Sequence, residues 1–181
     1  MSNKKNDSAF QHDKTDGHDE WLTPPEITTK LGPFDLDPCS PIDRPWPTAT
    51  KHYTILDNGL AQKWDGFVWC NPPYGREAPK WLEKMAMHNN GISLIFARTD
   101  TIAWHKWIFP KATSVCFMAG RITFYKVTGE IGNMGAGAPS ALVAYGEEAD
   151  RRIKEAKMGY YINLGNTQES KQKDVIDTLF E

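Results

Sequence analysis

Residues 66–75 read Gly-Phe-Val-Trp-Cys-Asn-Pro-Pro-Tyr-Gly, an apolar run that stops abruptly at two prolines. The run predicts a buried strand, because it is short, apolar and bounded by Gly and Pro. Neither Pro72 nor Pro73 can donate a hydrogen bond to a neighbouring strand, so the chain leaves the sheet there. We therefore expect the Asn-Pro-Pro-Tyr turn at the carboxyl end of a strand, the edge at which open α/β sheets bind ligands.

This turn offers hydrogen-bond acceptors with few competing donors. The side-chain oxygen of Asn71 and the backbone carbonyl of Pro72 are acceptors, whereas a proline has no N–H group. Such a turn suits an amino group. Tyr74 adds an aromatic face that can stack on a planar ring, such as a nucleobase with an exocyclic amine. An ordinary loop is the competing interpretation, and the position after an apolar strand favours the functional one.

The composition describes one globular domain. The chain has 181 residues, 40% of them hydrophobic, and no apolar run has the length of a membrane span. Residues 1–20 lack the apolar segment of a secretory signal, so we expect a cytoplasmic location. The three cysteines, Cys39, Cys70 and Cys116, are widely spaced, which favours buried free thiols over disulfides or a zinc site. With a formal net charge of −2, nucleic-acid binding requires a local basic patch.

The sequence divides into three parts. Residues 1–19 are polar and charged, with almost no large apolar side chains, which predicts a disordered arm. Residues 20–165 are predicted to form the folded domain, and residues 166–181 a loose polar tail. His12 and His18 are interpreted as solvated residues, because no other type of metal ligand clusters near them.

Two elements are predicted ahead of the central strand. Thr23 is expected to cap a short helix that begins at two prolines and ends near Gly32. The stretch Phe34-Asp35-Leu36-Asp37 alternates apolar and acidic residues, which predicts a strand, and Pro38 ends it. Paired carboxylates at a strand end fit either a metal or acid–base site or a simple turn, and Asp is a common turn former.

The connection between these two strands limits the size of the sheet. The segment from Pro41 to Asp65 is too short for two complete βαβ units, because each crossover needs at least about 10 to 12 residues. The sheet must therefore be abridged. Three prolines stiffen the first part of this segment, and Asp57-Asn58-Gly59 is a turn signal in the second.

The second half of the chain alternates helices and strands. We expect a helix after Pro79, a strand over 91–97, a helix over 102–109 capped by Thr99 or Asp100, a strand over 113–118, a further stretch over 122–125, a glycine-rich connection over 129–139, a last sheet strand over 140–145 and a basic helix over 147–158. Arg98 follows a strand, where it is either a structural ion-pair partner or a contact to phosphate or substrate. The basic helix is interpreted mainly as a solvated face, with DNA contact as the less favoured alternative.

Taken together, these features resemble the phage-type DNA N6-adenine methyltransferases, the compact Dam-like family of bacteriophages and prophages. The resemblance covers residues 21 to about 145 and depends more on order and spacing than on any one motif. It rests on Thr23-Pro24, Phe34 to Asp37, Tyr53-Thr54, Asp57 to Leu60, Trp64, Trp69 to Gly75 and Trp81. It implies an α/β fold with an abridged Rossmann-like class I methyltransferase sheet, mostly parallel with an antiparallel C-terminal hairpin.

The resemblance also implies a cofactor, S-adenosylmethionine, and roles for individual residues. The catalytic motif IV would consist of Asn71, Pro72, Pro73 and Tyr74. The residues that would lie against the cofactor are Thr23, Pro24, Asp35, Asp37, Pro38, Cys39, Asp57, Asn58 and Asn71. Of these, Asp57 and Asn58 would lie near the adenosine. The motif I region departs from the family pattern, because Pro38-Cys39-Ser40 replaces the usual Gly-x-Gly.

Double-stranded DNA is the partner that the resemblance implies, with Tyr74, Arg98 and Arg121 as the contacting residues and no metal. The chain has no room for a separate specificity domain, so we expect relaxed sequence specificity. Contacts to the DNA would then come from the 129–139 loop, the 41–56 loop or a partner subunit. The sequence leaves the oligomeric state open.

Three other functions fit parts of the pattern. Methyltransferases that act on RNA guanine or on protein glutamine carry the same four-residue turn. The missing glycines also fit a catalytically inactive protein that binds S-adenosylmethionine or DNA. A metal-dependent hydrolase that uses Asp35 and Asp37 is the third possibility, and it predicts that a chelator abolishes activity.

Overall fold

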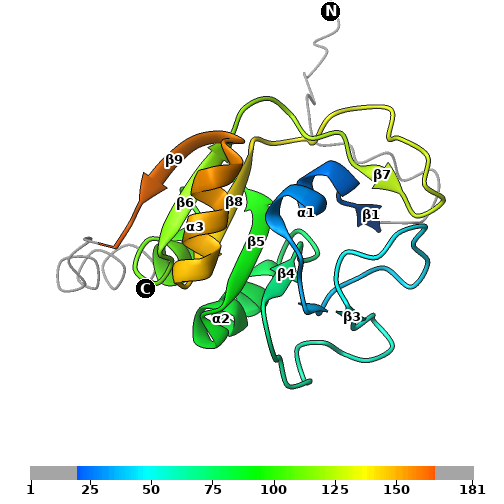
Figure 1. Ribbon diagram of the computed structural model, residues 1–181, viewed down its shortest axis with the longest axis horizontal. Coiled ribbons are helices and arrows are strands. Elements are labelled where there is room, and N and C mark those ends of the chain that lie inside the picture. Colours follow the sequence, from blue (N-terminus) through cyan, green and yellow to red (C-terminus); the bar gives the residue numbers. More distant parts are fainter. Residues whose placement is uncertain (1–19, 166–181) are drawn as a thin grey trace, which may run out of the picture.

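The computed structural model describes residues 20–165, which form a mixed α/β domain (Figure 1). Seven strands make one sheet in the order β3-β2-β4-β5-β8-β6-β9. Their bounds are β2 Leu36–Asp37, β3 Lys51–His52, β4 Val68–Cys70, β5 Gly91–Phe96, β6 Ser114–Met118, β8 Ser140–Tyr145 and β9 Gly159–Asn163. The predicted arm (1–19) and tail (166–181) lie outside the described residues.

The sheet is mostly parallel. Strands β3, β2, β4 and β5 pair in parallel, and β6 runs in the same direction because it is antiparallel to β8, which is itself antiparallel to β5. Only β8 and the edge strand β9 run in the opposite direction among the seven. The expected antiparallel pairing near the C-terminus is therefore confirmed, and the carboxyl ends of β2, β3, β4 and β5 meet at one edge.

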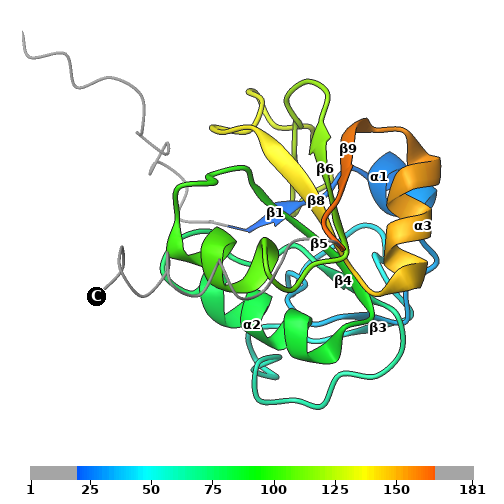
Figure 2. The same cartoon turned by 90° about the vertical axis from the view of Figure 1, so that its left-hand side faces the viewer.

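Helices cover both faces of the sheet, as Figure 2 shows. Helices α1 (Pro25–Leu31) and α3 (Glu147–Ala156) lie on one face, and α2 (Ala78–His88) with the π-helix η1 (Trp104–Ile108) on the other. Strand β4 shows why both faces need cover. Val68 and Cys70 pack toward α2, whereas Trp69 packs toward α1 and α3, and all three side chains are fully buried. A strand without a solvated face reads as a continuous apolar run, as it does here.

Three local expectations were wrong, and one short strand was not predicted. Thr23 does not cap α1: the cap position is Pro24, and no side chain bonds there. The short strand β3 was not predicted, because only two residues pair with β2. The predicted helix over 102–109 contains a π-helix with Ala103 at its cap, so neither Thr99 nor Asp100 caps it. Residues 140–145 are not the last strand, since β9 follows α3 and extends the sheet.

Residues 122–125 also behave differently from the expectation of a simple hairpin. Within this stretch and its neighbour, β7 (Tyr125–Lys126) leaves the main sheet and pairs antiparallel with β1 (Trp21–Leu22). The long connection from β6 to β8 thus folds back over the N-terminal end of the domain, beside α1 (Figure 1). This pairing fixes the position of Thr23, which comes directly after β1.

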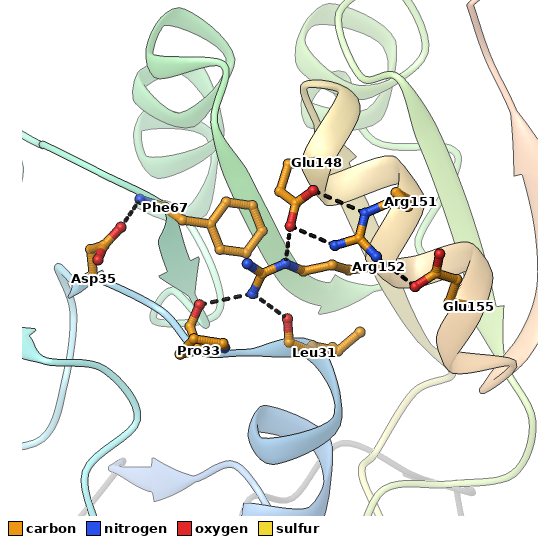
Figure 3. Close-up of polar contacts among 8 residues, drawn as sticks. All are labelled: Leu31, Pro33, Asp35, Phe67, Glu148, Arg151, Arg152 and Glu155. Atoms are coloured by element: carbon orange, nitrogen blue, oxygen red, sulfur yellow. Dashed lines mark hydrogen bonds and ion pairs between the residues drawn. The ribbon is translucent and has the colours of Figure 1, made fainter.

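Two arginines of α3 form hydrogen bonds and ion pairs with other residues of the protein (Figure 3). Arg152 donates to the backbone carbonyls of Leu31 (3.0 Å) and Pro33 (2.8 Å), and its guanidinium lies 4.2 Å from the ring centre of Phe67. Hydrogen bonds from Arg151 and Arg152 hold the pKa of Glu148 down at about 2. Arg152 therefore joins α3 to the end of α1 and does not lie on the expected solvated face, whereas the half-exposed Arg151 pairs with acidic residues of its own helix.

Replacing Arg152 by methionine is expected to lower the free energy of unfolding by about 2 kcal/mol, because two carbonyls lose a charged donor and Phe67 loses its cation contact. Equilibrium unfolding in urea measures this difference. The matched control is Arg151→Met on the same helix, which breaks only ion pairs of a half-exposed side chain and should have a much smaller effect. Equal losses in the two variants would contradict the role assigned to Arg152.

Candidate active site

The Asn-Pro-Pro-Tyr turn follows β4 directly, at the edge where the parallel strands end. Pro72 is buried and Pro73 exposed, so the chain turns outward between them. Asn71 is half-buried, and its amide group is held at both ends. Its nitrogen donates to the hydroxyl oxygen of Thr23 (3.3 Å), and its oxygen accepts from the Tyr74 hydroxyl (3.3 Å). The amide orientation is therefore fixed by residues that lie 48 positions before it and three positions after it.

Thr23 owes this role to the β1–β7 pairing. Its side chain is only 2% exposed, and β1 delivers it to the end of β4. The Asn71 oxygen has two lone pairs and uses one for Tyr74, so it retains acceptor capacity for an amino group. The hydroxyl of Thr23 thus accepts from the Asn71 amide and does not cap the helix.

Tyr74 is packed against a second aromatic ring. The rings of Tyr74 and Phe96 are stacked with centroids 4.0 Å apart and planes 5° from parallel, and Phe124 approaches Tyr74 edge-on at 6.5 Å. Burial raises the pKa of the Tyr74 hydroxyl, which therefore remains a neutral donor. Phe96 ends β5, so two neighbouring strand ends supply the stack. A flat aromatic surface at this edge is thereby held rigid.

Asp37, at the end of β2, is a buried carboxyl group. Its side chain is 4% exposed and accepts from the Thr48 hydroxyl and from the Cys39 N–H at 3.2 Å. Burial raises its pKa to about 6, although these hydrogen bonds and the charge of Arg44 oppose the shift. A buried carboxyl whose pKa lies close to neutrality is characteristic of functional sites. The loop that carries Thr48 is held in turn by His52, whose Nε2 accepts from the N–H groups of residues 48 and 49.

The Asp57-Asn58-Gly59 turn packs against the segment that follows Asp37. A Cβ atom added to Gly59 would lie 1.9 Å from the Pro38 carbonyl oxygen, so only glycine allows this approach. Asn58 adopts a left-handed conformation, with φ of 53°. The Asp57 carboxylate binds the Thr54 N–H and hydroxyl, both through Oδ2 (2.8 and 2.9 Å). The structure therefore brings the predicted cofactor residues around Asp37 and Asp57 to the same strand edge.

Asp35 lies elsewhere. Its carboxylate accepts from the Phe67 N–H (2.6 Å), ahead of β4, and it lines an open recess of about 430 Å³ together with Lys51, Lys63 and Gly66. This recess surrounds the amino ends of the parallel strands, opposite to Asn71. Asp35 and Asp37 have separate hydrogen-bond partners, so the structure does not combine them into one site. Within residues 20–165, no group of three or more His, Cys, Asp or Glu side chains is arranged to hold a metal ion.

Thiol groups also lie at this edge. The sulfur atoms of Cys39 and Cys70 are 3.8 Å apart, and all three cysteines are free, as predicted. Cys70 is buried between β2 and β5, directly before Asn71, while Cys39 is partly exposed. Burial raises the pKa of the Cys39 thiol, so it stays protonated near neutral pH.

The predicted DNA-binding arginines occupy two different loops. Arg98 is exposed beyond the end of β5, with its guanidinium 5.4 Å from the ring centre of Phe96. Arg121 is exposed on the β6–β8 connection and donates to the Ala136 carbonyl (3.0 Å). The same connection meets the 41–56 loop, where the Trp46 and Tyr125 rings contact edge to face with centroids 5.2 Å apart. Both expected specificity loops thus lie together.

Three residues around the site were not identified from the sequence. Phe96 and Thr48 appeared only as parts of a strand and a loop, and Thr23 was expected as a helix cap and a cofactor contact but not as the partner of Asn71. The signal for Phe96 was available, since it ends a buried strand next to β4, and an aromatic residue there faces the same edge as Tyr74. No signal marked Thr48, because its bond to Asp37 spans 11 residues of irregular chain.

None of the helices between residues 20 and 165 combines the length and apolar character that a membrane span needs. Comparison with curated proteins and with solved structures gave no match. Comparison with family models matched residues 11–170 to the family described as DNA N-6-adenine-methyltransferase (Dam). That match covers most of the chain, including β4 and the Asn-Pro-Pro-Tyr turn that closes it. The protein therefore belongs to the Dam family of DNA adenine methyltransferases.

Proposed function

We propose that this protein transfers a methyl group from S-adenosylmethionine to the N6 amino group of adenine in double-stranded DNA. The observation that carries the proposal is the geometry of Asn71. Its amide is oriented by Thr23 and Tyr74 at the carboxyl edge of the sheet. The buried carboxyl group of Asp37 ends the neighbouring strand β2, and the stacked rings of Tyr74 and Phe96 lie beside Asn71. Family membership supports the adenine substrate.

Asn71 and Pro72 would act on the adenine amino group. The Asn71 oxygen and the Pro72 carbonyl accept its two hydrogens, which draws the nitrogen toward tetrahedral geometry and directs its lone pair at the methyl donor. These acceptors are fixed before substrate arrives, so they require no reorganisation. No strong base is needed, because the amino proton is released after the new bond has formed.

Tyr74 would hold the adenine after it leaves the DNA helix. A base must be extruded from the duplex before an enzyme can reach its amino group, and stacking on an aromatic side chain compensates for part of the lost base stacking. Phe96 covers one side of Tyr74 and keeps its ring in a fixed plane. The Tyr74 hydroxyl binds Asn71, so base stacking and amino-group binding are coupled through one side chain.

The residues at the ends of β2 and β3 fit the cofactor. When bound, S-adenosylmethionine supplies an electrophilic methyl group on a positively charged sulfur. The carboxyl groups of Asp37 and Asp57 are acceptors suited to its ammonium group and ribose hydroxyls, respectively. The close approach of Gly59 to Pro38 keeps the Asp57 turn next to the β2 end. We assign the cofactor to this edge, with Thr23, Pro24, Pro38, Cys39, Asn58 and Asn71 around it and Asp35 outside it.

Mass spectrometry of nucleosides tests the reaction. Unmethylated plasmid DNA is incubated with the protein and S-adenosylmethionine, then digested, and we expect N6-methyladenine. N4-methylcytosine would retain the mechanism and change the base. Absence of any methylated nucleoside from DNA, with cofactor binding intact, would contradict the proposal and favour an RNA or protein substrate or a binding protein. Mapping the modified adenines then tests relaxed specificity, which strict modification of one long sequence would contradict.

Arg98 is expected to contact a DNA phosphate. Replacing it by alanine should weaken binding about equally for all DNA sequences and reduce the slope of log affinity against log salt by about 1. Fluorescence anisotropy with labelled duplexes at several salt concentrations measures both effects. Arg151→Ala on α3 is the control, since this arginine lies in the ion pairs of Glu148 and Glu155. An unchanged slope for Arg98→Ala would remove Arg98 from the DNA interface. We also propose a cytoplasmic location in a bacterial host cell, and the resemblance implies a phage or prophage origin.

A further inference from the structure

Lys84, on the second half of α2, binds the loop that follows β3. Its ammonium group donates to the backbone carbonyls of Leu60 (2.6 Å) and Gln62 and lies 3.5 Å from that of Gly59. It also lies 5.1 Å from the ring centre of Trp64. A single charged side chain thus contacts three carbonyls within four consecutive residues of one loop.

These carbonyls follow the proposed cofactor residues Asp57 and Asn58 directly in the chain. Asp57 binds Thr54 at one end of the turn, and the Asn58 carbonyl accepts from Ala61 (2.8 Å). At the other end, the Gly59 carbonyl accepts from the Trp64 indole (2.8 Å) in addition to its contact with Lys84. The ammonium group of Lys84 thus satisfies backbone acceptors at the end of the turn, much as a basic residue does at the C-terminus of a helix.

Two packing contacts hold the Asp57-Asn58-Gly59 turn in place. Gly59 packs closely against the Pro38 carbonyl, and Trp64 stacks on Trp81 of α2 with ring centroids 6.2 Å apart. Helix α2 begins shortly after the Asn-Pro-Pro-Tyr turn, so Lys84 connects the element behind the catalytic turn with the loop that carries Asp57. Helix α2 therefore contacts the Asp57 loop and also follows the Asn-Pro-Pro-Tyr turn in the chain.

We propose that Lys84 is a positioning residue for cofactor binding, which holds the Asp57-Asn58-Gly59 turn against Pro38 through the carbonyls of residues 59, 60 and 62. The inference rests on the proposed function, because it takes this turn to contact the adenosine. Lys84 itself does not touch cofactor or DNA in this role. Its loss should act on the affinity for the cofactor and leave the chemical step intact.

Isothermal titration calorimetry with S-adenosylhomocysteine on the full chain tests the proposal. We expect Lys84→Met to bind this ligand about 10- to 50-fold more weakly than the parent, because charged hydrogen bonds to the turn are lost. In steady state, the KM for S-adenosylmethionine should rise by a similar factor, while kcat at saturating cofactor and the KM for DNA stay within about threefold. Lys84→Arg, which keeps the charge and donors, should recover part of the affinity.

Two further variants separate positioning from general stability. Lys80→Met removes an exposed lysine of the same helix that is ion-paired with Glu77, and it should bind the ligand like the parent. Gly59→Ala displaces the same turn without changing any charge, since its Cβ would collide with Pro38, and it should reproduce the weaker binding. If Lys84→Met does not fold, Lys84→Gln carries the test of the lysine, and Gly59→Ala tests only whether the position of the turn sets the affinity.

The outcomes are distinct. Selective loss of cofactor affinity in the Lys84 variant and in Gly59→Ala, with Lys80→Met unaffected, supports the positioning role. A parent that binds and methylates, together with variants that bind S-adenosylhomocysteine equally well and differ only in melting temperature, would overturn the role of Lys84 and leave the proposed function standing. A parent that shows no binding of S-adenosylhomocysteine would overturn both.

Discussion

Replacing Asn71 by alanine is expected to lower kcat for DNA methylation by about 10²- to 10³-fold, because the variant loses a fixed acceptor for the adenine amino group. The affinity for S-adenosylhomocysteine should change much less, since Asp37 and the Asp57 turn stay in place. Methyl transfer from labelled S-adenosylmethionine to unmethylated DNA, measured at saturating substrates, gives kcat. Calorimetry on the same samples gives the affinity.

Asn71→Asp is the matched variant for this test. It keeps an acceptor oxygen at the same position, and the Thr23 hydroxyl can donate to the new carboxylate in place of accepting from the amide. We therefore expect Asn71→Asp to retain more activity than Asn71→Ala. Asn71→Ala loses the hydrogen bonds to both Thr23 and Tyr74, which should cost about 2 kcal/mol of unfolding free energy, whereas Asn71→Asp can keep both. An alanine variant with kcat within threefold of the parent would exclude Asn71 from the chemical step.

Replacing Asp37 by asparagine is expected to reduce cofactor affinity and to increase stability at pH 7 and above. In the folded protein, burial raises the pKa of this carboxyl from its ordinary 3.8 to about 6. The sign of the effect follows from linkage: a carboxyl with a raised folded pKa favours folding in its protonated form, so its contribution is full below about pH 4 and is lost as the pH rises through about 6. The shift corresponds to at most about 3 kcal/mol.

Relative to the parent, Asp37→Asn should therefore be more stable at pH 7 but bind the cofactor more weakly. In urea unfolding, the stability of the variant relative to the parent should rise between pH 4 and pH 7. In calorimetry at pH 7.5, the variant should bind S-adenosylhomocysteine at least about tenfold more weakly, because an amide does not attract an ammonium group as a carboxylate does. Affinity of the parent should decline below pH 6, as Asp37 becomes protonated.

Asp65→Asn provides the control for Asp37. Asp65 is exposed, pairs with Lys63 and lies at the amino edge of the strands, so it should alter neither the affinity nor its pH dependence. If Asp37→Asn bound the cofactor as the parent does, Asp37 would have a structural role through Thr48 alone. A buried carboxylate that costs stability at neutral pH and contributes nothing to binding would then lack an explanation.

The central part of the site was predictable from the sequence. The apolar run before Pro72 predicted β4 and its carboxyl end. The limited length of the segment from Pro41 to Asp65 excluded two complete βαβ units, and the structure has only the short strand β3 there. The order of motifs predicted the family, which the match over residues 11–170 confirms. Helix α2 also lies where its apolar stripe at helical spacing placed it, and α3 lies within the basic helix expected over 147–158.

Short strands and chain reversals were not predictable in the same way. Two-residue strands such as β3 carry too little pattern to recognise. Strand β9 has Tyr160 and Ile162 on its exposed side, so its alternation of apolar and polar residues is weak. Thr23 bonds Asn71 and does not cap α1 because β1, directly before it, pairs with β7. Strand β7 lies more than 100 residues later in the chain.

By itself, the sequence determined which backbone turn presents acceptors, because proline lacks an N–H group wherever it stands, and which runs must be buried, because apolar side chains leave water in any fold. Only the tertiary structure decided which partners those residues meet. The stack of Phe96 on Tyr74, the burial of Asp37 beneath Thr48 and the hold of Lys84 on the Asp57 turn join segments that are distant in the chain. Such contacts depend on strand order and loop paths, which local patterns do not encode.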